Sequence, residues 1–135
     1  DSQLAQIVGH ATDRLLEPFE VQSLVMSTQT DGSKIVEASV LNRETNTVQT
    51  YQSAGRGSVE ALIGALKQAI PLTCQFEDLE LFSLSAGEQA AGEAVVTIAV
   101  EGRTYRGFGV DDDVLTAVAR AYIAACNQAL RAYDK

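Results

Sequence analysis

One order of three strands and a helix runs through this chain twice, and it constrains the fold more than any other feature. In the first half, residues 19–28, 35–41 and 48–53 are rich in strand-forming side chains and are separated by turn signals. After Gly55-Arg56-Gly57 the apolar residues no longer recur every 2 residues, as in a strand, but about every 3.6 residues, as in a helix. This change predicts a helix that ends at Pro71. The expected apolar stripe of this helix is Val59, Leu62, Ile63, Leu66 and Ile70.

The second half repeats this order. Residues 72–85 predict a long strand, and residues 94–100 and 104–108 predict a hairpin around Glu101-Gly102. We expect Gly107-Phe108-Gly109 to form a turn equivalent to Gly55-Arg56-Gly57, followed by a helix to about residue 133. Its high alanine content favours close helix packing, within the chain or between two chains. The expected apolar stripe is Val114, Val118, Ala121, Tyr122, Ala125 and Ala129.

A leading helix is expected before the first unit. Ser2 is a suitable N-cap, and Pro18 stops helical geometry at about Glu17. We interpret residues 1–17 as this helix, a linker to a catalytic part missing from the chain, and residues 18–135 as one domain. The apolar stripe of this leading helix is Leu4, Ile7, Val8, Ala11, Leu15 and Leu16.

These elements predict the fold class. Strands joined by short turns pair antiparallel, and each three-stranded sheet needs a helix to cover its apolar face. We therefore expect an α+β fold with a leading helix and then two βββα units, over about residues 19–70 and 72–133, in which antiparallel sheets pack on helices. The two units are expected to stack through their helices.

Composition limits the classes of function. The formal net charge is −8 with 10 basic residues, which argues against a nucleic-acid surface. The sequence contains no apolar run of about 18–20 residues for a membrane span, and no leader pattern is visible. We expect a cytoplasmic protein with neither nucleic-acid nor membrane partners. Cys74 and Cys126 lack metal-ligand spacing and are expected to be buried, reduced thiols, with a disulfide as the alternative.

Catalytic groups are scarce. His10 is the only histidine, so a two-histidine metal site is excluded and a Ser-His-acid triad has no supporting motif. Asp111-Asp112-Asp113 lies where the last helix should begin, so we interpret it as a helix cap rather than a cation site. We expect no catalytic residue, metal or cofactor in this chain.

The turn at Gly55-Arg56-Gly57-Ser58 suggests binding instead. It opens onto a helix start, where backbone N–H groups without partners attract anions such as a carboxylate. It lacks the lysine and spacing of a phosphate-binding loop, so a small zwitterion fits better than a nucleotide. The competing explanation is that a tight turn requires glycine for backbone reasons alone.

Three motifs are specific enough to compare with known families. The first is Gly55-Arg56-Gly57-Ser58-Val59-Glu60-Ala61, and the second is Gly87-Glu88-Gln89-Ala90-Ala91-Gly92-Glu93. The third spans residues 107–127 and includes Gly107, Gly109, Asp113, Val114, Leu115, Ala121, Tyr122 and Asn127. In this order they resemble the regulatory (dimer) domain of 2-isopropylmalate synthases and citramalate synthases. The resemblance extends from about residue 19 to residue 130, and the family's doubled βββα fold agrees with the pattern above.

The resemblance implies a domain that binds an end-product amino acid between two copies and slows a separate catalytic barrel. The implied partners are therefore a branched-chain amino acid, a second copy of the chain and the catalytic domain of the parent enzyme. Leucine is the first expected effector, and isoleucine would indicate a citramalate synthase. Carried over by position, the effector contacts are expected from Gly55, Arg56, Gly57, Val59, Leu81, Leu84, Ala86 and Ala90.

Four positions depart from the family pattern. Arg56 stands where an acidic or polar residue is frequent, Ser58 where proline is frequent, Gln89 where aspartate is common and Val118 where serine is frequent. Arg56 would either pair with an effector carboxylate or crowd the site. A structural dimerisation module without an effector is therefore the alternative hypothesis.

Overall fold

The computed structural model describes residues 17–83 and 92–133, which form two three-stranded sheets and two helices. β1 (Phe19–Thr28), β2 (Lys34–Asn42) and β3 (Thr47–Gly55) pair antiparallel in that order, and α2 (Ser58–Lys67) follows them. β4 (Gln75–Ser83), β5 (Gly92–Val100) and β6 (Arg103–Asp111) form the second sheet, followed by α3 (Val114–Tyr133). The predicted doubled βββα order is confirmed, whereas the expected leading helix lies outside the described residues.

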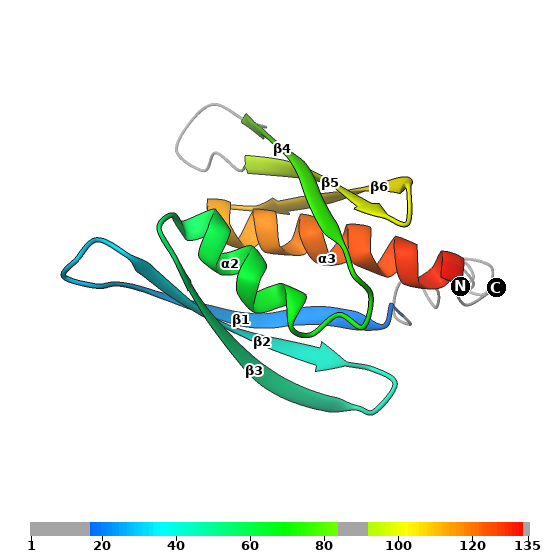
Figure 1. The fold of residues 1–135 in the computed structure, drawn as a ribbon, viewed down its shortest axis with the longest axis horizontal. Coiled ribbons are helices and arrows are strands. Elements are labelled where there is room, and N and C mark those ends of the chain that lie inside the picture. Colours follow the sequence, from blue (N-terminus) through cyan, green and yellow to red (C-terminus); the bar gives the residue numbers. More distant parts are fainter. Residues whose placement is uncertain (1–16, 84–91, 134–135) are drawn as a thin grey trace, which may run out of the picture.

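The two helices form a layer between the two sheets (Figure 1). α2 packs on β2 and β3, α3 packs on β5 and β6, and the helices contact each other, so the units stack through their helices as predicted. On β2, Val36, Ala38 and Val40 are buried, and the residues between them are more exposed. This alternation is typical of a sheet with one face on the core.

The turns between strands have the backbone geometry that their sequences indicated. Gly32 has φ +93° in the β1–β2 turn, and Asn46 has φ +57° in the β2–β3 turn. The β5–β6 hairpin turns through Glu101 at φ +51° and Gly102 at φ +83°. Positive φ at both central residues matches the right-handed twist of the flanking strands.

The expected turn at Gly107-Phe108-Gly109 is wrong, because both glycines lie inside β6, which continues to Asp111. Their role is close packing. A Cβ atom on Gly107 would lie 2.1 Å from the Ala121 carbonyl oxygen, and one on Gly109 would lie 2.2 Å from the Ala117 carbonyl oxygen. The alanines of α3 therefore serve mainly to bring this helix against β6.

The connection between the units is longer than the sequence indicated. α2 ends at Lys67 rather than near Pro71, and β4 begins at Gln75 rather than at residue 72. The connection contributes Ile70 and Cys74 to the core. Its apolar character, which suggested longer elements, therefore reflects its burial.

Three buried polar groups lie on α3. Asn127 is fully buried; its side chain accepts a hydrogen bond from the Phe19 N–H (3.2 Å) and donates one to the Phe19 carbonyl oxygen (2.9 Å). It therefore fixes the start of β1 to the second helix. Cys126 lies with its Sγ atom 3.8 Å from that of Cys74, and both are buried free thiols, as predicted. Tyr122 is also fully buried, and its hydroxyl lacks a hydrogen-bond partner among the described residues.

Candidate functional site

The start of α2 leaves backbone donors without a side-chain partner. Gly57 is the N-cap in an extended conformation, and within the described residues no side chain accepts a hydrogen bond at the cap. The Ala61 N–H bonds to the Gly57 carbonyl oxygen (3.1 Å), and the Arg56 N–H donates to Glu60 Oε1 (3.0 Å). The N–H groups at the start of a helix have no acceptor within that helix. This helix start is therefore suited to an external acceptor such as a carboxylate.

The start of α3 is occupied by the chain's own carboxylate. Asp113 Oδ2 accepts hydrogen bonds from the Thr116 N–H (2.9 Å) and the Thr116 hydroxyl (2.7 Å). The Asp113 N–H in turn donates to Asp111 Oδ2 (2.9 Å). The interpretation of the aspartate run as a helix cap is confirmed.

The two glycines before α2 have different physical roles. A Cβ atom on Gly55 would lie 2.9 Å from the Ala61 backbone nitrogen, so glycine is required there for the close approach of β3 and α2. A Cβ atom on Gly57 would meet nothing within 4 Å. Packing therefore explains Gly55, while the space beside Gly57 is open.

A groove runs along α2 from this helix start, and we call it the β3–α2 groove. It encloses about 530 Å³ between the end of β3, one face of α2 and the start of β4. Its apolar surface comes from Val59 and Ile63 of the helix and from Phe76, which is 37% exposed. The charged side chains of Glu60 and Lys67 also line it. The remaining lining residues are Ser53, Ala54 and Gly64.

The predicted effector residues lie in several places. Val59 lines the β3–α2 groove, and Gly55, Arg56 and Gly57 directly precede the helix that forms one of its walls. Leu81 lies on β4 with 54% of its surface exposed and is not among the residues lining this groove. The other three expected contacts, Leu84, Ala86 and Ala90, lie outside the described residues.

Arg56 lines a separate hollow with the β1–β2 turn, formed with Asp31, Gly32 and Ser33. The backbone N–H and the hydroxyl of Ser33 both donate to Asp31 Oδ1, and these bonds hold the pKa of the Asp31 carboxyl below its usual range. The Asp31 side chain thus lies in the same hollow as Arg56, outside the β3–α2 groove.

Of the eight residues that line the groove, sequence reasoning assigned only Val59 to the effector site and missed the other seven. Ile63 and Lys67 follow Val59 at intervals of four, so helical periodicity was the signal that could have placed them on one face. Phe76 comes from the other repeat, and no local pattern indicates that it approaches α2.

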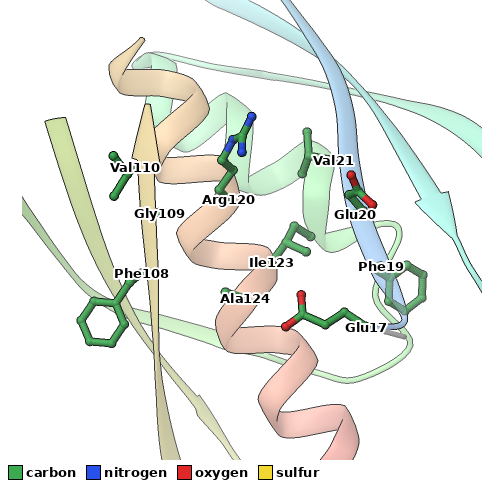
Figure 2. A pocket seen from close by; sticks show the side chains of 10 residues that line it. All are labelled: Glu17, Phe19, Glu20, Val21, Phe108, Gly109, Val110, Arg120, Ile123 and Ala124. Carbon is green, nitrogen blue, oxygen red and sulfur yellow. The ribbon is translucent and has the colours of Figure 1, made fainter. Parts of the chain in front are cut away.

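A second groove lies at the equivalent place in the other repeat. β6 begins at residue 103, which is 56 residues after the start of β3 at residue 47. α3 begins at residue 114, which is likewise 56 residues after the start of α2 at residue 58. Gly109, Val110, Arg120 and Ile123 therefore correspond to Ser53, Ala54, Gly64 and Lys67. This β1–α3 groove encloses about 540 Å³ (Figure 2). It is lined by Glu17, Phe19, Glu20, Val21, Phe108, Gly109, Val110, Arg120, Ile123 and Ala124.

Residues 17–83 and 92–133 contain no group of three or more histidine, cysteine, aspartate or glutamate side chains arranged to hold a metal ion. Neither described helix is long and apolar enough to cross a membrane.

Residues 1–130 match the family model described as the LeuA allosteric (dimerisation) domain. The 2-isopropylmalate synthase of Bacillus pumilus is 34% identical over 112 residues, which cover 83% of this chain and 22% of the relative. The 2-isopropylmalate synthase of Nitrosomonas eutropha is 29% identical over 128 residues, which cover 95% of this chain and 25% of the relative. The 2-isopropylmalate synthase of Caulobacter sp. is 28% identical over 135 residues, which cover 100% of this chain and 25% of the relative. The chain thus spans about a quarter of the length of these relatives.

Proposed function

Because the chain belongs to the LeuA allosteric (dimerisation) domain family, we propose that it is the effector-binding and dimerisation part of a 2-isopropylmalate synthase, with leucine as the effector. The relatives that carry this enzyme name are about four times as long as the chain. The acyl-transfer chemistry is therefore assigned to the part of the enzyme outside this sequence.

The observation that carries the proposal is the uncapped start of α2 beside the β3–α2 groove. Backbone N–H groups there would take the carboxylate of an amino acid. Glu60 lies on the first turn of the same helix and offers a negative charge to the ammonium group of the amino acid. In any α-amino acid this ammonium group lies only a few ångströms from the carboxylate. Val59, Ile63 and Phe76 provide an apolar surface for an aliphatic side chain. The site thus combines the three features that a branched-chain amino acid requires.

A second copy of the chain is the proposed cover of the groove. In one copy the groove is open, and Phe76 stays more than one-third exposed. A ligand of this size is normally buried over most of its surface when it binds tightly. Closure by a second copy would supply the missing wall and couple binding to dimerisation.

Isothermal titration calorimetry with leucine, isoleucine and valine tests the proposal. We expect saturable binding of leucine. Valine, which has one methylene fewer, should bind more weakly by about 1–3 kcal/mol, and isoleucine, an isomer of leucine, should bind more weakly because its side chain branches at a different carbon. A preference for isoleucine would indicate a citramalate-synthase type of regulator. A folded dimer that binds none of the three would leave a structural dimerisation module.

The Gly57→Asp variant tests the position of the site. Its carboxylate would cap α2 as Asp113 caps α3, and the open space at Gly57 accepts the side chain. We expect leucine affinity to fall about tenfold or more, because a fixed negative charge then occupies the place of the effector carboxylate. The control is Asp113→Ala, which changes the other helix start and should leave the affinity unchanged. Equal affinity of wild type and Gly57→Asp would place the effector elsewhere.

A further inference from the structure

We propose that Cys74 and Cys126 form a redox-active pair, which a hydroperoxide oxidises to a disulfide bond within the chain. They are the only two cysteines of the sequence, and their Sγ atoms lie 3.8 Å apart. Both are buried free thiols, and neither lines the β3–α2 groove. The proposal therefore depends neither on the effector nor on its site.

The two sulfur atoms belong to segments that are held in place to different degrees. Cys126 lies on α3, the helix that packs on β5 and β6. Cys74 lies in the connection from α2 to β4, which contains neither helix nor strand (Figure 1). The Sγ–Sγ distance of 3.8 Å is about 1.8 Å longer than the roughly 2.0 Å of a disulfide. A small movement of Cys74 toward the helix would close this difference.

A small oxidant reaches Cys74 more easily than Cys126. Among the described residues, the backbone hydrogen bonds of the connection are confined to residues 68–70, at the end of α2. Pro71 and Thr73, which precede Cys74, are exposed. This stretch can therefore open without breaking a helix or a sheet, whereas exposure of Cys126 requires α3 to move. Cys74 is thus the sulfur that we expect to react first.

Electrostatics favour the same order of reaction. The Cys126 thiol donates a hydrogen bond to Cys74 Sγ. This bond lowers the pKa of Cys74 against the opposing effect of burial, and the positive charge of Lys67 lowers it further. The same hydrogen bond, together with burial, raises the pKa of Cys126. Because the thiolate is the nucleophile in thiol oxidation, Cys74 attacks the oxidant and Cys126 remains the protonated second thiol.

The oxidation proceeds in two steps. The Cys74 thiolate attacks one oxygen of hydrogen peroxide, the O–O bond breaks, and Cys74 becomes a sulfenic acid. The hydroxide that leaves takes up the proton that the Cys74 thiol released. Cys126 Sγ then attacks Cys74 Sγ and displaces the second hydroxide, which leaves as water with the Cys126 proton. The two thiols thus lose two electrons to the peroxide, which is reduced to two molecules of water.

The disulfide would close a loop around the second sheet. Cys74 directly precedes β4, and Cys126 lies on the helix that follows β6, so all three strands of that sheet lie between the two sulfur atoms. A cross-link between residues 52 positions apart restricts the unfolded chain. It would also fix the segment before Phe76, which lines the β3–α2 groove. Oxidation would therefore stabilise the second repeat and hold one wall of the groove.

Treatment of the reduced 135-residue chain with hydrogen peroxide tests this proposal. The treated chain is unfolded, its remaining thiols are alkylated, and its intact mass is measured. We expect a single chain that has lost two hydrogen atoms and carries no alkyl group, and dithiothreitol should restore both thiols. The midpoint of thermal unfolding should be at least about 5 °C higher for the oxidised chain than for the reduced one.

Two matched serine variants test the order of the steps. In Cys126→Ser, oxidation should stop at the sulfenic acid of Cys74, which dimedone traps. In Cys74→Ser, trapping at Cys126 should be at least about tenfold slower, because that thiol is more buried and stays protonated. Circular dichroism reports whether each variant is folded, and Cys126→Ala replaces Cys126→Ser if the hydroxyl unfolds the core.

Three results would overturn the proposal. The first is a folded wild-type chain that keeps both thiols after the treatment, and the second is a disulfide that forms only between two chains. The third is an oxidised chain that unfolds at a lower temperature than the reduced one, because the bond would then not fit the folded state. Equal trapping in the two serine variants would overturn the assigned order. Failure of leucine binding would not affect any of these readouts.

Discussion

The two repeats share one topology, but they treat the start of their helices in opposite ways. In the second repeat Asp113 caps α3, because its carboxylate accepts hydrogen bonds from the N–H and the hydroxyl of Thr116 in the first turn. In the first repeat Gly57 stands at the equivalent position and contributes no side chain to α2. The two helix starts of this duplicated architecture thus differ in one side chain, and only the start of α2 lacks a side-chain cap.

The packing of strand against helix is also reversed between the repeats. In the first repeat the glycine lies on the helix, where Gly64 faces Ser53 of β3. In the second repeat the glycine lies on the strand, where Gly109 faces Ala117 and Arg120 of α3. These are equivalent pairs of positions, so the glycine at this strand–helix contact comes from the helix in one repeat and from the strand in the other.

The largest expected effect comes from filling the strand–helix contact of the second repeat. In Gly107→Ala the added Cβ would lie 2.1 Å from the Ala121 carbonyl oxygen and 2.4 Å from the Ala125 backbone nitrogen. Backbone atoms cannot yield without moving α3, so we expect the free energy of unfolding to fall by about 3 kcal/mol or more. Urea denaturation monitored by circular dichroism measures this change.

Gly64→Ala adds the same methyl group at the strand–helix contact of the first repeat, on the helix instead of the strand. Its nearest neighbour is the Ser53 hydroxyl at 2.4 Å, which can rotate away, and alanine improves helix propensity by about 1 kcal/mol. We expect the free energy of unfolding to change by no more than about 1 kcal/mol. Adding Ser53→Gly to this variant should recover any loss. A loss of stability equal to that of Gly107→Ala would contradict this difference between the two strand–helix contacts.

The second prediction concerns the part of α3 that has no counterpart in α2. Asn127 lies beyond the length of the shorter helix and fixes Phe19 at the start of β1. Asn127→Ala should lower the free energy of unfolding by about 2–3 kcal/mol, because it leaves a buried N–H and carbonyl group without partners. The neighbouring Gln128→Ala removes an exposed bond to the Arg106 carbonyl oxygen and should cost less than about 1 kcal/mol. Equal losses would show that Asn127 does not hold the two repeats together.

The third prediction compares the helix caps. Asp113→Ala should reduce the free energy of unfolding by about 1 kcal/mol, because the Thr116 N–H loses its acceptor. Gly57→Asp should raise it by a few tenths of a kcal/mol while it weakens leucine binding. Thermal unfolding with and without leucine separates the two effects. A gain of stability with unchanged leucine binding would contradict the role assigned to the open helix start.

The smallest expected effect at neutral pH concerns Tyr122, whose counterpart in α2 is Leu66. Burial raises the pKa of Tyr122 well above its usual range. The folded state thus favours the protonated phenol, and this contribution is complete below the unfolded-state pKa of about 10 and lost progressively above it. Tyr122→Phe should raise the free energy of unfolding by less than about 1 kcal/mol at pH 7. The reason is that it removes a buried hydroxyl without a hydrogen-bond partner in the described part of the chain. Above pH 10 the variant should lose less stability than the wild type, as measured by urea denaturation across the pH range.

Local patterns in the sequence determined the order of elements, the strand turns and the capping of α3. Each of these depends on residues close together in the chain: alternation along β2, positive φ at Gly102, and an aspartate three residues before Thr116. Physical preferences of this kind act within a few residues, so they can be predicted from the sequence without knowledge of the fold. The position of the α2 start was predicted for the same reason.

Only the tertiary structure decided what lies beside these elements. It placed Gly107 and Gly109 inside β6, since their small size matters only where α3 packs against that strand. It brought Phe76 to the face of α2 and directed Arg56 toward the Asp31 turn rather than into the groove. Contacts between segments far apart in the chain depend on how the two repeats pack, and no local pattern of apolar or charged residues contains that information.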